Sequence, residues 1–178
     1  KQAYRAARLL TQIMDFNPQS NLECRPLELK TFLTTLTEPL KKILPENIQI
    51  QLICAKNDLL VNVDVTRLEN VFLNLAINSR AAMADGGILR LEASAITTTL
   101  DSPSPVRDMP PGQWAKITIT DTGIGIPPQT LPHIFEPFFS TKNRNKGIGL
   151  GLAQVYNNVK RHDGFINAVS DLDRGTSF

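Results

Sequence analysis

Glycine is concentrated in one part of the chain. The stretch from Asp121 to Leu152, DTGIGIPPQTLPHIFEPFFSTKNRNKGIGLGL, holds five glycines, and with Gly175 it accounts for six of the ten in the protein. Because glycine loses more conformational entropy on folding than other residues, the backbone shapes that it permits here must serve a purpose. A phosphate cradle, a flexible lid and a pair of tight turns are the alternatives for this stretch.

Hydrophobic periodicity predicts an α+β protein with helices on one face of a mixed sheet. Apolar residues at helical spacing predict helices at 1–16, 29–44, 65–83 and 149–161. Alternating apolar and polar residues predict strands at 48–54, 59–63, 87–97, 115–121 and 165–170. The strands follow one another in hairpin-like pairs interrupted by helices, which indicates two layers. The proline-rich segment 100–112 is expected to be an exposed loop.

The composition argues against several classes of protein. A net charge of +2 without a basic stripe gives no support for nucleic-acid binding. Cys24 and Cys54 cannot form a disulfide framework and lack metal-ligand spacing, so we expect buried thiols in a reducing, cytoplasmic setting. No apolar run has the length of a membrane span, and we expect no membrane contact from this fragment. The missing initial Met and a final strand that stops in mid-course predict a piece of a longer protein.

A carboxylate is predicted on the buried face of the strand that precedes the glycines. Period 2 places Asp121 on the same side as Ala115, Ile117 and Ile119, where an unpaired carboxylate is costly. One interpretation is that Asp121 caps the turn that follows it. The other is that it accepts a hydrogen bond from a ligand donor such as the amine of adenine.

Three asparagines form a stripe on the predicted helix 65–83. Asn70, Asn74 and Asn78 are four residues apart and therefore share one face of the helix. A solvated polar face is the simpler interpretation, although such faces usually carry Glu, Lys or Arg. Carboxamide oxygens are also suitable ligands for Mg²⁺, which completes its shell with water and phosphate.

The second glycine cluster, at 147–151, directly precedes the predicted helix 149–161. The N–H groups and the dipole at such a helix start favour phosphate, with Lys142 close upstream. A Walker loop is excluded because the chain has no Gly-Lys pair, and Pro128 stands where a dinucleotide fingerprint needs its third glycine. A flexible surface turn remains the alternative.

In combination these features resemble the ATP-binding catalytic domain of two-component sensor histidine kinases, in the GHKL superfamily shared with gyrase and MutL. The segments that carry the resemblance are NLAINSRAAM (74–83), DTGIG (121–125), FEPFFSTK (135–142), GIGLGL (147–152) and GTSF (175–178). The form of the third segment is similar to the nitrogen-regulation and hybrid-kinase branch. The resemblance implies a Bergerat-type two-layer α/β sandwich with an N-terminal helical remnant.

The resemblance also implies roles for individual residues and the cofactors ATP and Mg²⁺. Asn78 would hold Mg²⁺ against the phosphates with support from Asn74, Asp121 would accept from the adenine amine, and Lys142 would neutralise phosphate charge. We count Asn74, Asn78 and Lys142 as catalytic. The other residues expected to contact ATP are Gly123, Gly125, Ile126, Phe138, Gly147, Gly149, Leu150, Gly151, Leu152 and Thr176.

The lid glycines would let the loop open and close around ATP, and the aromatic block would anchor it between them. Phe135, Phe138 and Phe139 are also expected to dock against the kinase's helical hairpin, with packing in the core as the alternative. In hydrolytic relatives a Glu, four residues before the Mg²⁺-binding Asn, activates water. That position is Asn74 here, which cannot act as a base, so we expect ATP to be held for transfer.

Some residues depart from the family pattern. Ile148 replaces the Thr usual between the first two lid glycines, Asp163 stands where the family often has Gly, and Asn157-Asn158 replaces a common Gly-containing pair. The phosphoacceptor box is absent. His133 and His162 lack its flanking pattern, and both are interpreted as structural or solvated.

The resemblance divides the chain into three parts. Residues 1–17 would end the helix of a dimerisation and phosphotransfer hairpin, 18–26 would be a linker, and 27–178 the ATP-binding domain. The expected partners are that hairpin, in a homodimeric full-length protein, and a response regulator or receiver domain. The alternatives are a degenerate nucleotide-binding module that acts through protein contacts, and a GHKL serine kinase or anti-sigma regulator.

Overall fold

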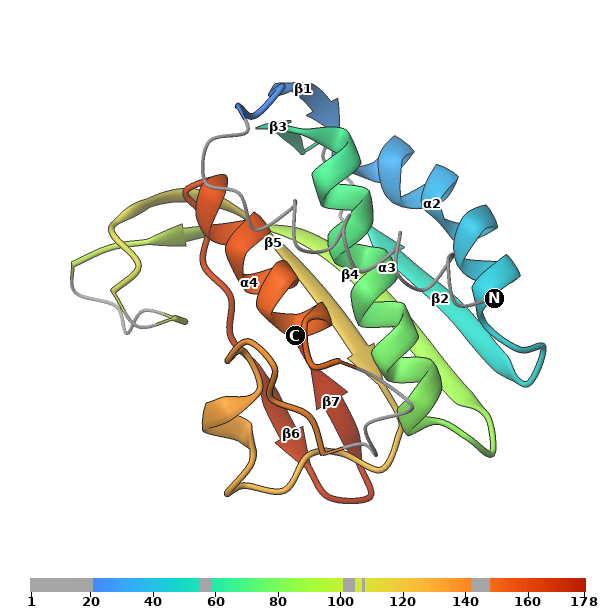
Figure 1. Ribbon diagram of the computed structural model, residues 1–178. Helices are drawn as coiled ribbons and strands as arrows, with labels where there is room; N and C mark the ends of the chain where they lie inside the picture. The colour runs from blue at the N-terminus through green and yellow to red at the C-terminus, as the bar shows by residue number, and fades with distance from the viewer. Residues whose placement is uncertain (1–20, 55–58, 101–104, 107, 142–147) are drawn as a thin grey trace.

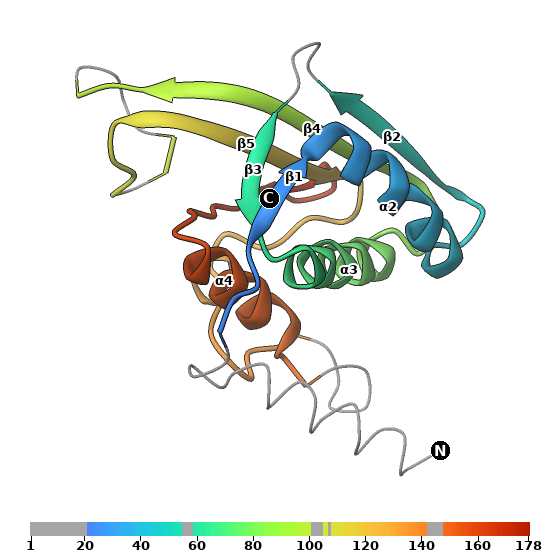
Figure 2. The same ribbon diagram turned by 90° about the horizontal axis from the view of Figure 1, so that it is seen from above.

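Three helices cover one face of a five-stranded sheet. The computed structural model describes residues 21–54, 59–100, 105–106, 108–141 and 148–178. Figure 1 shows the helices in front of the sheet, and Figure 2 shows the same two layers from above. The predicted α+β architecture is therefore confirmed. The predicted helix 1–16, Lys142 and Gly147 lie outside the described residues.

The strands of the main sheet run in the order β2-β4-β5-β7-β6. Their bounds are Ile48–Cys54 for β2, Gly87–Thr98 for β4, Gly112–Asp121 for β5, Val169–Asp171 for β6 and Gly175–Ser177 for β7. β2 pairs with β4 in parallel, and the other pairs are antiparallel. The sheet is therefore mixed, as predicted.

The expected pairing of successive strands is wrong for β2 and β3. β3 (Leu60–Val63) pairs instead with β1 (Arg25–Glu28) in a separate two-stranded sheet. β2 reaches its parallel partner β4 through α3, because parallel neighbours need a crossover connection. β1 was not predicted from the sequence, and it begins inside the expected linker 18–26. The predicted strand 165–170 is mostly irregular, and only its end belongs to β6.

The helices α2 (Leu29–Ile43), α3 (Val65–Ala82) and α4 (Gly151–Arg161) lie close to their predicted positions. Asp64 caps α3, because its side chain accepts a hydrogen bond from the N–H of Arg67. The core lies between this layer and the sheet. Its fully buried large side chains include Leu33 and Leu40 of α2, Leu75 of α3, Val155 of α4, and Leu89 and Leu91 of β4.

The two cysteines differ from the expectation of buried thiols. Cys54 is half-buried in β2, and this burial raises the pKa of its thiol. Cys24 is exposed, in the segment directly before β1. Among the residues that the structure describes, no helix combines the length and apolar character that crossing a membrane would need.

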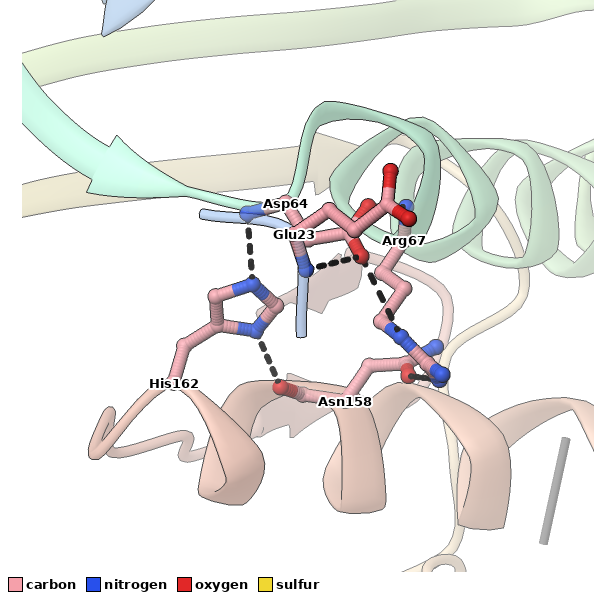
Figure 3. A network of polar contacts seen from close by, with 5 residues as sticks. All are labelled: Glu23, Asp64, Arg67, Asn158 and His162. Carbon is pink, nitrogen blue, oxygen red and sulfur yellow. Dashed lines mark hydrogen bonds and ion pairs between the residues drawn. The ribbon is translucent and has the colours of Figure 1, made fainter. Parts of the chain in front are cut away.

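A polar network fixes the start of α3 against the end of α4 and against the segment before β1 (Figure 3). His162 accepts the backbone N–H of Asp64 at Nε2 (2.9 Å), and its Nδ1 lies 2.7 Å from the carbonyl oxygen of Asn158. The Asp64 carboxylate accepts the N–H of Glu23 (3.3 Å) and pairs with Arg67 (3.4 Å). His162 is therefore structural, as one of the two interpretations held.

Asp64 makes the stability of the domain depend on pH. Burial raises the pKa of its carboxyl group, but the N–H groups of Arg67 and Glu23 and the charge of Arg67 outweigh it, and the pKa lies below its ordinary value. A lowered pKa contributes stability that is complete above the unfolded-state pKa of about 3.9 and is lost as the pH falls through the folded-state value.

We therefore expect Asp64→Asn to lower the free energy of unfolding by about 1–2 kcal/mol at pH 7. The difference from the wild type should shrink as the pH falls below about 3.9 and vanish only below the lowered folded-state pKa, where the wild-type carboxylate is protonated in both states. Urea unfolding at about pH 7, 4 and 2 measures it. A difference of constant size at all three pH values would show that the charge of Asp64 contributes nothing.

Candidate functional site

Asp121 lies at the end of β5 on the face that the helices cover, as predicted. Only 3% of it is exposed. Its Oδ1 accepts the backbone N–H groups of Gly123 (3.0 Å) and Thr176 (3.3 Å), and its Oδ2 accepts the hydroxyl of Ser79 (2.8 Å). The bond to Gly123 is the predicted turn cap. A buried carboxylate with three neutral donors keeps acceptor capacity, so the turn cap and ligand binding are compatible.

Ser79 is a site residue that the sequence analysis missed. It lies in α3 directly after Asn78, and it is fully buried although it is polar. The serine next to the asparagine stripe, on the buried side of the helix, was the available signal. Its contact with Asp121 joins the end of β5 to α3.

Asn74 and Asn78 lie beside the glycine that begins α4. A Cβ added to Gly151 would lie 3.6 Å from Oδ1 of Asn74 and 4.0 Å from Nδ2 of Asn78. The Nδ2 of Asn74 donates to Gln154 (3.4 Å). The Nδ2 of Asn78 is buried and has no hydrogen-bond partner among the described residues. The structure thus brings the asparagine stripe and the second glycine cluster together.

The start of α4 presents backbone and no capping side chain. Leu150 is the N-cap residue and makes no side-chain cap, and the N–H groups of a first helical turn have no partner within the helix. The side chain of Leu150 is buried, and Leu152 packs against the core. Leu150 can therefore serve a ligand through its backbone only, whereas Leu152 is partly buried.

The first glycine turn packs tightly against two neighbouring segments. A Cβ on Gly123 would lie 2.7 Å from the Cβ of Ala82 in α3. Gly125 has φ +72°, and a Cβ there would lie 2.1 Å from the carbonyl oxygen of Asp171. Ile126 donates its N–H to the hydroxyl of Ser170 (2.8 Å). These contacts hold the turn between α3 and the β6–β7 hairpin, beside Asp121.

Thr176 supports Asp121 from β7. It is buried, and its hydroxyl lies 2.8 Å from that of Ser170. Gly175 before it has φ +103°, and a Cβ there would lie 1.9 Å from the carbonyl oxygen of Asp121. The glycine therefore allows β7 to approach the end of β5.

The aromatic block and the second glycine cluster are joined through their backbones. Phe138 donates its N–H to the carbonyl oxygen of Gly149 (2.9 Å), and both residues have positive φ, 67° and 74°. Phe138 is 71% exposed, whereas the ring of Phe135 lies 5.6 Å from that of Tyr156. The Phe138–Gly149 bond thus holds the aromatic block against the second glycine cluster. Within the block, Phe135 packs against Tyr156 and Phe138 is open to solvent.

His133 touches the aromatic block, its ring lying 5.8 Å from that of Phe139, and no described contact joins it to Asp121, Asn74 or Asn78. It is exposed, and its Nδ1 lies 2.7 Å from a carboxylate oxygen of Glu136. It is solvated, which is one of the two interpretations given for it.

Comparison with known proteins identifies the family. Residues 63–178 match the family model of histidine kinase-, DNA gyrase B- and HSP90-like ATPases. The chain belongs to this family. Membership in this ATPase family implies that the domain binds ATP.

The chain is also similar to curated sensor kinases. It is 36% identical over 176 residues to the sensor kinase CckA of Brucella abortus. The match covers 99% of this chain and 19% of CckA. The chain thus spans about a fifth of that relative.

Solved histidine kinase structures share the fold. Full-length ShkA in complex with AMPPNP matches with a TM-score of 0.72 at 23% identity, over 99% of this chain and 37% of that one. The histidine kinase ThkA in complex with the response regulator protein TrrA matches with a TM-score of 0.68 at 20% identity, over 99% and 46%. At these identities the likeness shows the fold alone.

Proposed function

We propose that this domain binds Mg²⁺-ATP and donates the γ-phosphoryl group to a histidine on a separate helical hairpin in a two-component system. The observation that carries the proposal is the amide of half-buried Asn78, whose buried nitrogen, beside Gly151, has no hydrogen-bond partner among the residues that the structure describes. An unsatisfied buried donor costs about 1–3 kcal/mol, and a ligand that satisfies it removes that cost. The similarity to the sensor kinase CckA supports the kinase assignment.

The residues at this point fit a metal–triphosphate. An amide in the position of Asn78 can offer its oxygen to Mg²⁺ and its nitrogen to a phosphate oxygen. The uncapped start of α4 offers backbone N–H groups to phosphate at the same place. When bound, Mg²⁺ neutralises charge on the transferring phosphoryl group.

The remaining assignments follow from this arrangement. Asp121 reads the adenine amine, and Asn74 supports Asn78. In the same proposal Lys142 neutralises phosphate charge and, with Asn74 and Asn78, belongs to the catalytic group. The further ATP contacts are Gly123, Gly125, Ile126, Phe138, Gly147, Gly149, Leu150, Gly151, Leu152 and Thr176.

The side chain at position 74 favours transfer over hydrolysis. Asn74 is an amide that donates to Gln154, and neither group can take a proton from water. Positioning and charge neutralisation then supply the catalysis.

The proposed partners are the domain's own dimerisation hairpin, to which residues 1–17 would belong, and a response regulator. The solved complex of ThkA with TrrA, which has this fold, supports the second partner. Exposed Phe138 belongs to the surface proposed to dock on the hairpin.

A thermal-shift experiment with the chain tests nucleotide binding. At 100 times the dissociation constant, ATP or ADP with Mg²⁺ stabilises a folded domain by about 2.7 kcal/mol, which corresponds to about 5–10 °C in Tm at this size. GTP should give a much smaller shift, because guanine presents an oxygen where adenine presents its amine. An equal shift with GTP would remove the role proposed for Asp121.

Transfer is tested separately by mixing the chain with a hairpin that carries the acceptor histidine and with γ-labelled ATP. Label on the histidine is the expected result. Tight binding of ATP without any transfer would instead identify a nucleotide-binding module that acts through protein contacts.

A further inference from the structure

The two carboxylate oxygens of Asp121 are used unequally. Oδ1 accepts two backbone N–H groups, from Gly123 and Thr176. Oδ2 accepts a single donor, the hydroxyl of Ser79 at 2.8 Å. Each oxygen of an ionised carboxylate has about two lone-pair sites. Among the described contacts, Oδ2 is therefore the oxygen with room for one more donor.

Ser79 determines what can approach that oxygen. A serine hydroxyl has one proton, and here that proton is used in the bond to Oδ2. With 1% of its surface exposed, Ser79 has little access to water, and its oxygen has only acceptor capacity left. Once this bond is made, Oδ2 and the Ser79 oxygen have only acceptor capacity left, and this pair has no proton to offer to a ligand.

We propose that Ser79 is a specificity-determining positioning residue, which directs the free lone pair of Oδ2 toward the amine of adenine. This inference rests on the proposed nucleotide-binding function. The carboxylate is planar, so the two backbone donors on Oδ1 and the Ser79 hydroxyl on Oδ2 fix its rotation about Cβ–Cγ together, and Ser79 is the donor that holds Oδ2. A hydrogen-bond donor on the purine finds an acceptor there, and a carbonyl oxygen faces two acceptors.

The position of Ser79 on α3 also ties the two halves of the pocket together. Asn78, the preceding residue, lies beside Gly151 at the start of α4, and Ser79 holds the end of β5. Asn78 and Ser79 are consecutive residues of one helix. The distance between the Asn78 amide and the Asp121 carboxylate, which Ser79 holds, is therefore fixed by α3. Removing the hydroxyl takes away the donor to Oδ2, leaves the two backbone bonds to Oδ1, and keeps the helix in place.

The experiment compares two nucleotides on the whole chain by calorimetry in the presence of Mg²⁺. One is ADP, and the other is the diphosphate of purine riboside, which lacks the amine. A hydrogen bond to a charged group corresponds to roughly a 10- to 150-fold preference of the wild type for ADP. In Ser79→Ala we expect this preference to fall by about 5- to 10-fold because ADP binds more weakly. The affinity for the analogue should change by less than about 2-fold.

Two further variants control for packing. Ser79→Thr keeps the hydroxyl and should restore most of the preference for ADP. Thr98→Val removes a buried hydroxyl that donates to Pro110 at the far end of β4, and it should leave the preference unchanged. If Ser79→Ala does not fold, Ser79→Cys keeps a side chain of similar size with a weak donor and should show the same loss in smaller measure.

The outcomes separate this inference from the function on which it rests. Equal weakening of ADP and the analogue in Ser79→Ala, or no change in either, would overturn the role of Ser79 and leave the proposed function standing. A wild type that binds both nucleotides equally would overturn the role of Asp121, and a wild type that binds neither would overturn the proposed function itself, in both cases before any variant is made. A selective loss for ADP that Thr restores supports the inference.

Discussion

Replacing Asn78 by alanine is expected to lower phosphoryl transfer to the acceptor histidine by at least about 100-fold, the loss typical when one preorganised group that stabilises transition-state charge is removed. The amide of Asn78 lies beside the start of α4, and no described residue accepts a hydrogen bond from its nitrogen. Without it, Mg²⁺ loses its proposed protein ligand and the phosphates lose a donor. Single-turnover transfer from γ-labelled ATP to a hairpin with the acceptor histidine measures the effect.

Asn70→Ala provides the matched control. Asn70 lies on the same stripe of α3, two turns nearer its N-terminus, and has no role in the proposed site. It should transfer at nearly the wild-type rate. Asn78→Ala should also lose the Mg²⁺ dependence of its ADP-induced thermal shift while it keeps the adenine-dependent part. Wild-type transfer by Asn78→Ala would rule out the proposed metal position.

The parts of the fold that could be predicted from the sequence are those in which the relevant residues are near one another in the chain. Period 2 along β5 put Asp121 on the buried face, and the structure confirms it. Spacing by four residues put Asn74 and Asn78 on one face of α3, and both lie beside Gly151. Side-chain direction within one element follows from backbone geometry, so no tertiary information was needed.

The parts that could not be predicted depend on contacts between distant segments. Ser79 and Asp121 are 42 residues apart, and although its place beside the asparagine stripe marks the serine as buried, its partner lies on another element. The bond between Asp64 and His162 joins residues 98 apart. β1 is only four residues long, and its partner β3 lies beyond α2 and β2. Such pairings are decided by how the layers pack, which hydrophobic patterns do not specify.

Replacing Asp121 by asparagine is expected to weaken ADP binding by roughly 10- to 150-fold, the range for a hydrogen bond to a charged group. The variant can keep the fold, since the amide oxygen still accepts the N–H groups of Gly123 and Thr176. The amide nitrogen then stands where Oδ2 stood, and the hydroxyl of Ser79 can turn to accept from it. The pocket thereby presents a donor to the purine where the wild type presents an acceptor.

This reversal makes the result specific to the base. Inosine diphosphate has a carbonyl oxygen at the position of the adenine amine, so Asp121→Asn should bind it better than the wild type does while it binds ADP worse. Asp173→Asn is the control, because Asp173 is exposed in the β6–β7 turn at φ 59°, a conformation that asparagine tolerates. Its affinities for both nucleotides should equal those of the wild type. Only direct contact with the base distinguishes an amine from a carbonyl at one ring position. If Asp121→Asn weakened the binding of ADP and of inosine diphosphate equally, the carboxylate would therefore act on the fold of the pocket and not on the base.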